Sequence, residues 1–284
     1  MSSYDRRLTA ARPDLAAEHL RGTIDAERFV TPQPGRISVA LADLLPRPDA
    51  KASPDTQLLH GERVDIYDQA DGWVWVQAAN DGYVGYLSGD TVEPAPQATA
   101  THRVATLGTN IYSTPSLKTR VTGQLPFGSE VSVSETRDGH VRIGPDQWLP
   151  EPHVVPIDHR TTDWVSVAEM FLGVPYLWGG RSNLGLDCSA LVQLARQAGG
   201  HACLRDSDMQ AEREAETLAP DAPLRRGDLI FWRGHVGIMT DPAMLLHANG
   251  HHMAVVREPL ADAIQRIQAA EDSPVTRRAR FAAT

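Results

Sequence analysis

The sequence contains one cysteine in the setting of a nucleophile. Cys188 follows Asp187, a residue type that caps helix starts, and an apolar helical pattern runs on to Ala198. Cys188 would then be the first residue of that helix, where unpaired N–H groups and the helix dipole stabilise a thiolate. This position predicts nucleophilic chemistry by the Cys188 thiol.

A thiol nucleophile also needs a base, and two histidines lie at the ends of predicted strands. His235 begins a strand after the turn Arg233-Gly234, and His247 lies near the end of the next strand. In a two-stranded meander these ends lie side by side. We therefore expect His235 to accept the thiol proton, and His247 to bind the other ring nitrogen of His235 and orient it, as in a nucleophile–base–orienter triad.

The same three side chains are also good zinc ligands. No Cys-x-x-Cys or His-Glu-x-x-His spacing supports a zinc site, so neither a metal nor an organic cofactor is expected. The other cysteine, Cys203, is expected to be an inert buried side chain. Two cysteines are too few for a disulfide framework and suit a reducing compartment.

Two helices and a strand meander are expected to position these residues. The apolar pattern predicts helices over 163–172 and 186–198, followed by three antiparallel strands. The expected strand ranges are 229–232, 235–239 and 243–248. Helices followed by a meander indicate an α+β domain, which we assign to residues 160–284.

The preceding half of the chain is expected to be rich in strands. A weakly amphipathic stretch predicts an N-terminal helical arm over 1–35. Short alternating runs broken by Asp-Gly turns then predict two small β-barrels, at 36–95 and 102–157, joined by a proline-rich linker. The turn Asp71-Gly72 recurs as Asp138-Gly139, so we interpret the two barrels as diverged copies.

Composition and charge limit the partners and the cellular compartment that can be expected for the protein. With 284 residues, 42% of them hydrophobic, the chain can form two or three folded domains. The net charge is −9 and no long basic run occurs, so neither nucleic acid nor an anionic membrane surface is an expected partner. No signal-peptide core or membrane-spanning apolar run is found, and a cytoplasmic location is expected.

Several segments of the C-terminal region resemble the motifs of one peptidase family. They are Pro175-Tyr176-x-Trp178-Gly179-Gly180, Asp187-Cys188-Ser189, Gly227-Asp228-Leu229-Ile230-Phe231, His235-Val236-Gly237-Ile238 and Leu246-His247-Ala248. In this order they are similar to the motifs of the NlpC/P60 family of papain-like cysteine peptidases. The two upstream regions resemble bacterial SH3 (SH3b) modules. The combination is similar to γ-D-glutamyl-L-diamino acid endopeptidases, which act on murein peptides.

The resemblance implies two SH3b-like β-barrels followed by a papain-like α+β catalytic domain, with Cys188 as nucleophile, His235 as base and His247 as orienter. It implies that the Tyr176 hydroxyl and the backbone N–H of Cys188 bind the oxyanion. It also implies an acidic residue in the first SH3b module that receives the free amine of the substrate, which we match to Glu62. The substrate-binding residues implied in this way are Glu62, Tyr83, Trp178, Asp187, Ser189 and Ser207.

The expected activity is hydrolysis of the γ-D-Glu–diamino acid bond in murein-derived tripeptides or tetrapeptides with a free N-terminal L-Ala. The missing signal peptide favours recycling of imported peptides. Two alternatives stay open: a secreted enzyme that remodels the wall, and a non-catalytic protein that binds wall peptides. The sequence also leaves open whether the diamino acid is diaminopimelate or Lys, the oligomeric state, and whether Arg181 or Arg205 binds a substrate carboxylate.

Overall fold

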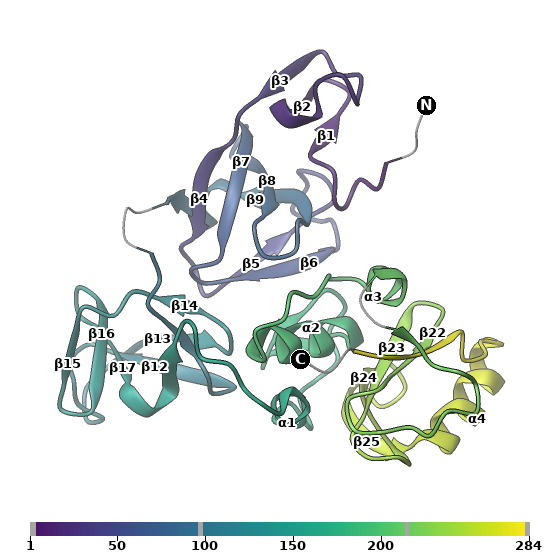
Figure 1. Cartoon of the computed structure of the whole chain (residues 1–284). Helices are drawn as coiled ribbons and strands as arrows, with labels where there is room; N and C mark the ends of the chain where they lie inside the picture. The colour runs from purple at the N-terminus through teal and green to yellow at the C-terminus, as the bar shows by residue number, and fades with distance from the viewer. Residues whose placement is uncertain (1–3, 96–98, 214–215, 282–284) are drawn as a thin grey trace. The chain divides into compact units, whose positions relative to one another are not determined.

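A computed structural model describes residues 4–95, 99–213 and 216–281 of the chain (Figure 1). The chain divides into two compact units, Met1–Asp158 and His159–Thr284. Strands dominate the first unit, whereas the second unit combines helices with a sheet. Within the described ranges, no helix is long and apolar enough to cross a membrane.

The N-terminal segment forms short strands, so the helical arm predicted over 1–35 is wrong. Its elements are β1 (Ala11–Arg12), β2 (Leu15–Ala17), the 3-10 helix η1 (Glu18–Leu20) and β3 (Arg28–Val30). All three residues of β2 are buried, and Leu15 and Ala17 pack in one cluster with Tyr67 and Trp75. A surface helix buries one stripe rather than three consecutive side chains. Gly22, with a φ of 82°, also interrupts the helical pattern.

Two β-rich regions complete the first unit. The first contains β4 (Gln33–Ile37), β5 (Leu41–Leu44), β6 (Thr56–Leu59), β7 (Arg63–Ala70), β8 (Trp73–Ala78), β9 (Val84–Ser88), η2 (Gly89–Thr91) and β10 (Val92–Pro94). The second contains β11 (His102–Val104), β12 (Gly108–Tyr112), β13 (Val121–Pro126), β14 (Glu130–Val131), β15 (Glu135–Arg137), β16 (His140–Gly144), β17 (Gln147–Pro150), η3 (Glu151–His153) and β18 (Val154–Pro156). The linker predicted between them includes residues 96–98, which lie outside the described residues.

The two β-rich regions share the turn that the sequence predicted. Asp71 and Gly72 join β7 to β8 with φ values of 53° and 79°, and Asp138 and Gly139 join β15 to β16 with φ values of 49° and 70°. Positive φ at both central residues is the geometry of a tight two-residue hairpin, which favours glycine. Each region has a five-stranded sheet and a smaller partner sheet, and no closed ring of strand pairing is found among the described residues.

The second unit is the expected α+β domain, with a six-stranded antiparallel sheet in the order β21-β26-β22-β23-β24-β25. The strands are β21 (Glu216–Thr217), β22 (Leu229–Trp232), β23 (His235–Met239), β24 (Met244–Asn249), β25 (Ala254–Pro259) and β26 (Arg277–Arg280), and β19 (Arg181–Ser182) pairs separately with β20 (Gly185–Leu186). The helices are α1 (Trp164–Glu169), α2 (Cys188–Ala198), α3 (Ser207–Arg213) and α4 (Leu260–Glu271).

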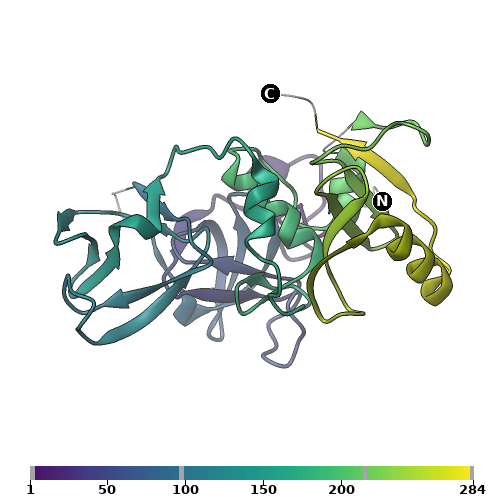
Figure 2. The ribbon, with the colours of Figure 1, turned by 90° about the horizontal axis from the view of Figure 1, so that it is seen from below.

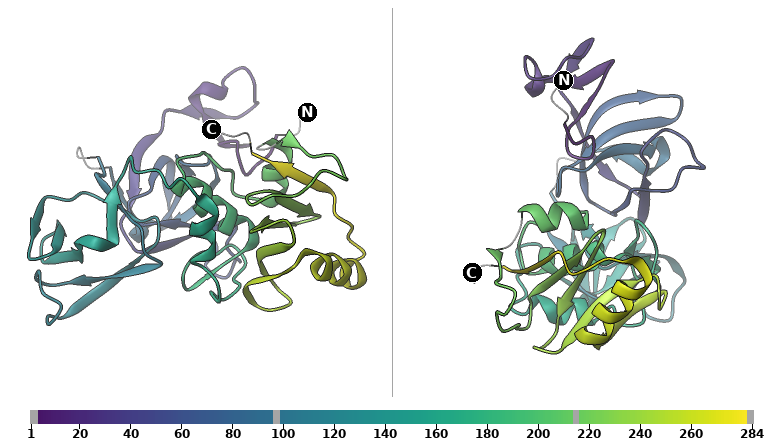
Figure 3. Two further views of the ribbon diagram at one scale, coloured as in Figure 1. Left: turned by 60° about the horizontal axis from the view of Figure 1, so that its bottom comes forward. Right: turned by 90° about the vertical axis from the view of Figure 1, so that its right-hand side faces the viewer.

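The six-stranded sheet lies between α2 and α4 (Figures 1 and 2). Helix α2 packs on β23 and β24, and α4 packs on β24 and β25. Figure 3 shows α4 along one face of the sheet. The predicted helices and strands of the meander are all found, whereas β25, β26 and α4 were not predicted. The sheet thus holds both histidines on strands that contact α2, the helix of the candidate nucleophile.

Candidate active site

Cys188 is the first residue of α2, as the sequence predicted. Asp187 is the N-cap, and its Oδ1 accepts a hydrogen bond from the backbone N–H of Ala190 at 2.8 Å. The Cys188 residue is 6% exposed. Because the first N–H groups of a helix have no partner within it, the backbone N–H of Cys188 points out of the helix start, where an oxyanion can be bound.

A buried ion pair holds the start of α2 in place. Both guanidinium nitrogens of Arg205 donate to the Asp187 carboxylate, at 2.9 and 2.7 Å. Arg205 also donates to the Ser189 hydroxyl at 2.9 Å. The second carboxylate oxygen of Asp187 accepts the backbone N–H of Gly179 at 3.0 Å. Asp187 therefore joins the glycine-rich loop before β19 to the helix that carries Cys188.

The two histidines are in direct hydrogen-bond contact. His235 begins β23 and His247 lies in β24, and Nε2 of His235 is 2.8 Å from Nδ1 of His247. This contact agrees with the expected orienter role of His247. Helix α2 packs against β23, and the backbone N–H of Val236 lies close enough to the Cys188 thiol to lower its pKa.

The sequence analysis missed a carboxylate that continues this series of hydrogen-bonded side chains. Nε2 of His247 is 2.7 Å from Oε1 of Glu258 in β25, and Arg266 of α4 donates to both oxygens of Glu258, at 2.7 and 2.6 Å. Leu245 pairs with Glu258 across β24 and β25, which places Glu258 and His247 on the same face at diagonal positions. No motif marks Glu258, and its only sequence signal is a carboxylate on a strand that follows the histidine strand.

Burial favours the uncharged forms of Cys188 and of both histidines. It raises the pKa of the Cys188 thiol to about 12, and the charge of Asp187 adds to this effect. Burial lowers the pKa of His235 to about 3 and that of His247 to about 4. Burial and the charge of Asp187 thus oppose the thiolate that the helix start is expected to stabilise, and the ionisation state of Cys188 stays a prediction. A buried thiol of this kind needs a neighbouring base to become a nucleophile, which is the role expected of His235.

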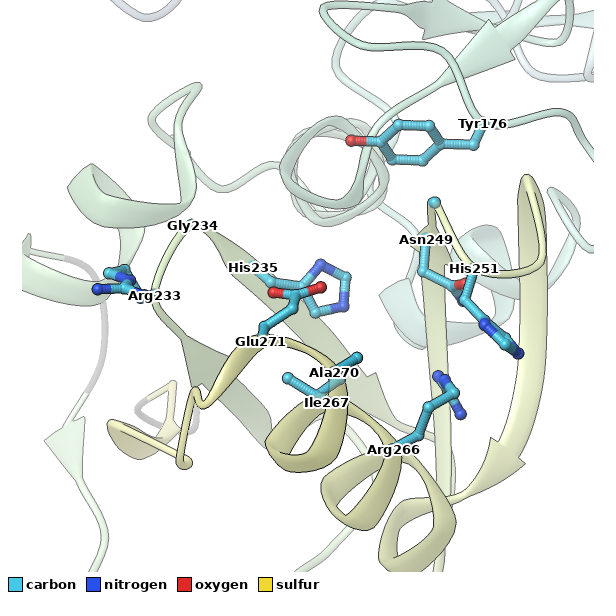
Figure 4. Close-up of a pocket in the computed structure, with 11 residues that line it drawn as sticks. Tyr176, Arg233, Gly234, His235, Asn249, His251, Arg266, Ile267, Ala270 and Glu271 are labelled. Atoms are coloured by element: carbon cyan, nitrogen blue, oxygen red, sulfur yellow. The ribbon is translucent and has the colours of Figure 1, made fainter.

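Tyr176 and His235 line one pocket of about 280 Å³ in the second unit (Figure 4). Its other lining residues are Arg233, Gly234, Asn249, Gly250, His251, Arg266, Ile267, Ala270 and Glu271. Burial raises the pKa of the Tyr176 hydroxyl, and the nearby Cys188 adds to the rise. Tyr176 therefore stays protonated and can donate a hydrogen bond near the thiol, as its predicted oxyanion role requires.

The other residues predicted to bind substrate in this unit fall into two groups. Trp178 is 67% exposed beside the pocket residue Tyr176, and Ser207 is half-buried at the start of α3. Asp187 and Ser189 are nearly buried, and their side chains bind each other and Arg205. The structure gives these two a role in holding the helix start, and direct contact of any of the four with substrate stays a prediction.

Glu62 and Tyr83 lie in the first unit and are both nearly buried. The Glu62 carboxylate accepts the backbone N–H of Leu59 at 2.9 Å and the side-chain amide of Asn80 at 3.2 Å. Its charge therefore has partners within its own β-rich region and does not need a substrate ammonium to compensate it. Binding of substrate by Glu62 and Tyr83 stays a prediction.

Neither arginine considered from the sequence is available to a substrate carboxylate. Arg181 and Arg205 are each 1% exposed, and Arg205 is bound to Asp187. The arginines that line the pocket are Arg233 and Arg266. Among the described residues, no group of three or more His, Cys, Asp and Glu side chains is arranged to hold a metal ion.

Two family models match the chain. Residues 44–91, in the first β-rich region, match the bacterial dipeptidyl-peptidase SH3 domain. Residues 173–268 match the NlpC/P60 family. The second match contains Cys188, both histidines, Glu258 and Arg266.

Curated relatives and a solved structure agree with these matches. The chain is 24% identical to dipeptidyl-peptidase 6 of Lysinibacillus sphaericus, over 74% of this chain and 85% of the relative. It is 26% identical to the gamma-D-glutamyl-L-lysine dipeptidyl-peptidase of Bacillus subtilis, over 68% of this chain and 71% of the relative. An NlpC/P60 family protein from Bacillus cereus has the same fold, with a TM-score of 0.72 at 19% identity, over 87% of this chain and 99% of that one. The chain thus combines a bacterial dipeptidyl-peptidase SH3 domain with the peptidase domain of the NlpC/P60 family.

Proposed function

We propose that this peptidase hydrolyses the amide bond between γ-linked D-Glu and a diamino acid in small murein peptides with a free N-terminal L-Ala. The observation that carries the proposal is the buried Cys188 at the start of α2, on a domain whose histidines form a hydrogen-bonded chain. The names of the relatives in Bacillus support the bond that is cleaved.

The first half of the reaction forms a thioester. The Cys188 sulfur attacks the γ-carbonyl carbon of D-Glu while its proton passes to His235. The oxygen of the tetrahedral intermediate is bound by the backbone N–H of Cys188 and the Tyr176 hydroxyl. His235 then gives the proton to the leaving nitrogen, the C–N bond breaks, and the diamino acid departs with a neutral amine.

The second half returns the free enzyme. Water attacks the thioester carbon and gives a proton to His235, and collapse of the second tetrahedral intermediate breaks the C–S bond. The sulfur regains its proton from His235, and L-Ala-γ-D-Glu leaves with a new carboxyl group. No net charge is left on the histidine at either end of the cycle, in keeping with the low pKa of buried His235.

The pocket beside His235 supports a charged leaving residue. Because His235 protonates the leaving nitrogen, the leaving residue must lie next to its ring. Arg233 and Glu271 line that pocket, and both are exposed. A diamino acid carries a carboxylate and an ammonium group, which match these two charges. This complementarity favours a diamino acid over an apolar residue after the scissile bond.

The proposal extends to recycling of free peptides in the cytoplasm, a reducing compartment that a chain with two cysteines suits. In this role the enzyme acts on released peptides rather than on the intact wall. Solubilisation of intact sacculi at a rate comparable to tripeptide cleavage would instead favour the wall-remodelling alternative. A cap on the N-terminal L-Ala is expected to slow cleavage about 100-fold, and equal rates would remove the free-amine part of the proposal.

Product analysis by mass spectrometry tests the proposed bond. The substrates are L-Ala-γ-D-Glu-L-Lys and L-Ala-γ-D-Glu-meso-diaminopimelate, with the α-linked isomer L-Ala-α-D-Glu-L-Lys as a matched control. We expect L-Ala-γ-D-Glu and the free diamino acid from at least one of the γ-linked peptides, and no cleavage of the control. Cleavage before D-Glu, or equal cleavage of the α-linked isomer, would contradict the proposal.

A further inference from the structure

We propose that Glu258 is a positioning residue that fixes which nitrogens of His247 and His235 carry protons, and so keeps the catalytic base able to accept the thiol proton. Glu258 touches neither the thiol nor the pocket that holds the leaving residue, and it acts through His247. The inference rests on the nucleophile–base roles of Cys188 and His235 but not on the identity of the peptide substrate.

The contacts of Glu258 are well suited to hold a proton in one place. His247 is 0% exposed, and its Nε2 lies 2.7 Å from Oε1 of Glu258. Arg266 donates to both oxygens of the same carboxylate. Burial alone would raise the pKa of Glu258, but the hydrogen bonds from Arg266 and His247 hold that pKa below its ordinary value. Glu258 therefore stays ionised and can only accept.

The ionised carboxylate determines the proton positions on both hydrogen-bonded histidines, His247 and His235. Because Glu258 only accepts, Nε2 of His247 must carry a hydrogen, and Nδ1 of a neutral His247 then has a free lone pair. That lone pair, 2.8 Å from Nε2 of His235, accepts the hydrogen on Nε2 of His235. Nδ1 of His235 is left without a hydrogen, and it is the nitrogen that can take the proton of Cys188.

Asn249 would impose the opposite arrangement if Glu258 were absent. Its side-chain nitrogen lies 3.0 Å from the same Nε2 of His247, while its oxygen accepts the backbone N–H of His252 at 2.8 Å. A hydrogen bond from Asn249 to Nε2 would move the His247 proton to Nδ1. Nε2 of His235 would then have to accept, Nδ1 of His235 would carry the hydrogen, and the base would be lost. The shorter, charge-assisted contact with Glu258 favours the productive arrangement.

Glu258 controls which ring nitrogens of the two histidines carry protons, and it does not control whether the rings are charged. Glu258, Arg266, His252 and the hydrogen-bonded His235 act on His247, and His247, Arg266 and Glu258 act on His235. Burial holds the pKa of both catalytic-chain histidines far below neutrality. Both rings are therefore neutral at pH 7, with or without a charge at position 258.

The test compares Glu258→Gln with Arg257→Gln, an adjacent exposed position on β25 that serves as the control. In the full chain labelled with ¹⁵N-histidine, NMR reports which ring nitrogens carry hydrogen. We expect Nε2–H on His235 and His247 in the wild type and in Arg257→Gln. The glutamine amide can donate to Nε2 of His247, so Glu258→Gln should show Nδ1–H on His247. Its kcat should fall about 100-fold with KM changed less than about threefold.

A conservative variant separates this role from a merely structural one. Glu258→Asp keeps the ionised acceptor, and we expect it to restore Nε2–H on His247 and at least about a tenth of the wild-type kcat. If Glu258→Gln melts near room temperature, the same tautomer measurement on Glu258→Asp at low temperature still decides: Nδ1–H on His247 there would overturn the proposal. Wild-type tautomers and wild-type kcat in folded Glu258→Gln would also overturn it. The tautomer measurement needs no substrate, so an error in the proposed substrate leaves it interpretable.

Discussion

The second unit contains two arginine–carboxylate pairs with different partners, Arg205–Asp187 at the start of α2 and Arg266–Glu258 beside His247. Arg205 and Asp187 are buried, with side chains 1% and 11% exposed, and the carboxylate binds backbone N–H groups of Gly179 and Ala190. Arg266 is more exposed than Arg205, at 22%, whereas Glu258, at 12%, is about as buried as Asp187, and its carboxylate binds an imidazole. The first pair holds backbone segments in place, and the second determines which imidazole nitrogens carry protons.

The difference follows from what each carboxylate accepts. Backbone N–H groups hold their protons permanently, so Asp187 determines only where the loop and the helix start lie. The imidazole can carry its proton on either nitrogen, so Glu258 also determines a chemical state. Loss of the first pair should therefore appear mainly as loss of stability, whereas loss of the second should appear mainly as loss of rate.

The largest expected effect is on the stability of the second unit. Arg205→Met leaves the buried Asp187 carboxylate without its main partner, which should cost about 3–5 kcal/mol of unfolding free energy. Arg266→Met removes an arginine that is 22% exposed, so water can replace part of its contact with Glu258, and the loss should be smaller than in Arg205→Met. Denaturant unfolding of both variants measures the two losses. Equal losses would remove the distinction between the pairs.

The next effect is on the rate, and it separates the base from its orienter. His235→Ala removes the proton acceptor and should lower kcat by at least about 10³-fold. The loss of kcat in His247→Ala should be at least about tenfold smaller. Steady-state kinetics with a tripeptide measures both, with circular dichroism as the check on folding. A larger loss of kcat in His247→Ala than in His235→Ala would show that His247, and not His235, accepts the proton.

The burial of Cys188 and His235 predicts an unusual pH profile. Since burial lowers the pKa of His235 to about 3, the base stays neutral from neutral pH down to about pH 4, and kcat/KM should fall only below that. Because the thiol pKa is raised to about 12, alkylation of Cys188 by iodoacetamide should keep accelerating above pH 9. Alkylation that is fast and independent of pH between 5 and 8 would instead indicate a preformed thiolate.

A further effect on stability concerns Glu130 in the first unit. Burial, followed by the charge of Glu62, raises the pKa of Glu130 from 4.5 to about 7, and Arg63 and Arg103 lower it only in part. Between these two pH values the unfolded chain has lost this proton and the folded chain still holds it. The stability of the first unit should therefore decrease as pH rises from 4.5 to 7, then level off. Melting temperatures at pH 5 and pH 8 measure the decrease, and Glu130→Gln should abolish it. An unchanged difference in that variant would assign the effect to other groups.

The sequence was most informative where one local interaction decides the structure. An Asp before the helix start predicted the position of Cys188, and Asp-Gly pairs at 71–72 and 138–139 predicted the repeated turns. A helix cap and a tight turn each depend on a few neighbouring residues. The strand ends placed His235 and His247 together because a meander brings adjacent strands side by side.

Features that depend on distant contacts were missed. The N-terminal arm was predicted as a helix, but packing of Leu15 against Tyr67 and Trp75 decides its structure. Glu258 and Arg266 meet only because α4 folds back on β25, which no local pattern indicates. The burial of Cys188, which raises the pKa of its thiol, was also missed, since its position at a helix start is visible in the sequence and its burial is not.

The central claim, that the chemistry takes place at Cys188, has a direct test because the chain has only two cysteines. Cys188→Ala and Cys203→Ala each remove one thiol from a buried position. With L-Ala-γ-D-Glu-diamino acid peptides and product detection by mass spectrometry, Cys188→Ala should lose at least about 10³-fold in turnover. Cys203→Ala, once shown to be folded, should stay within about threefold of the wild type. Turnover by folded Cys188→Ala at the wild-type rate would contradict the account.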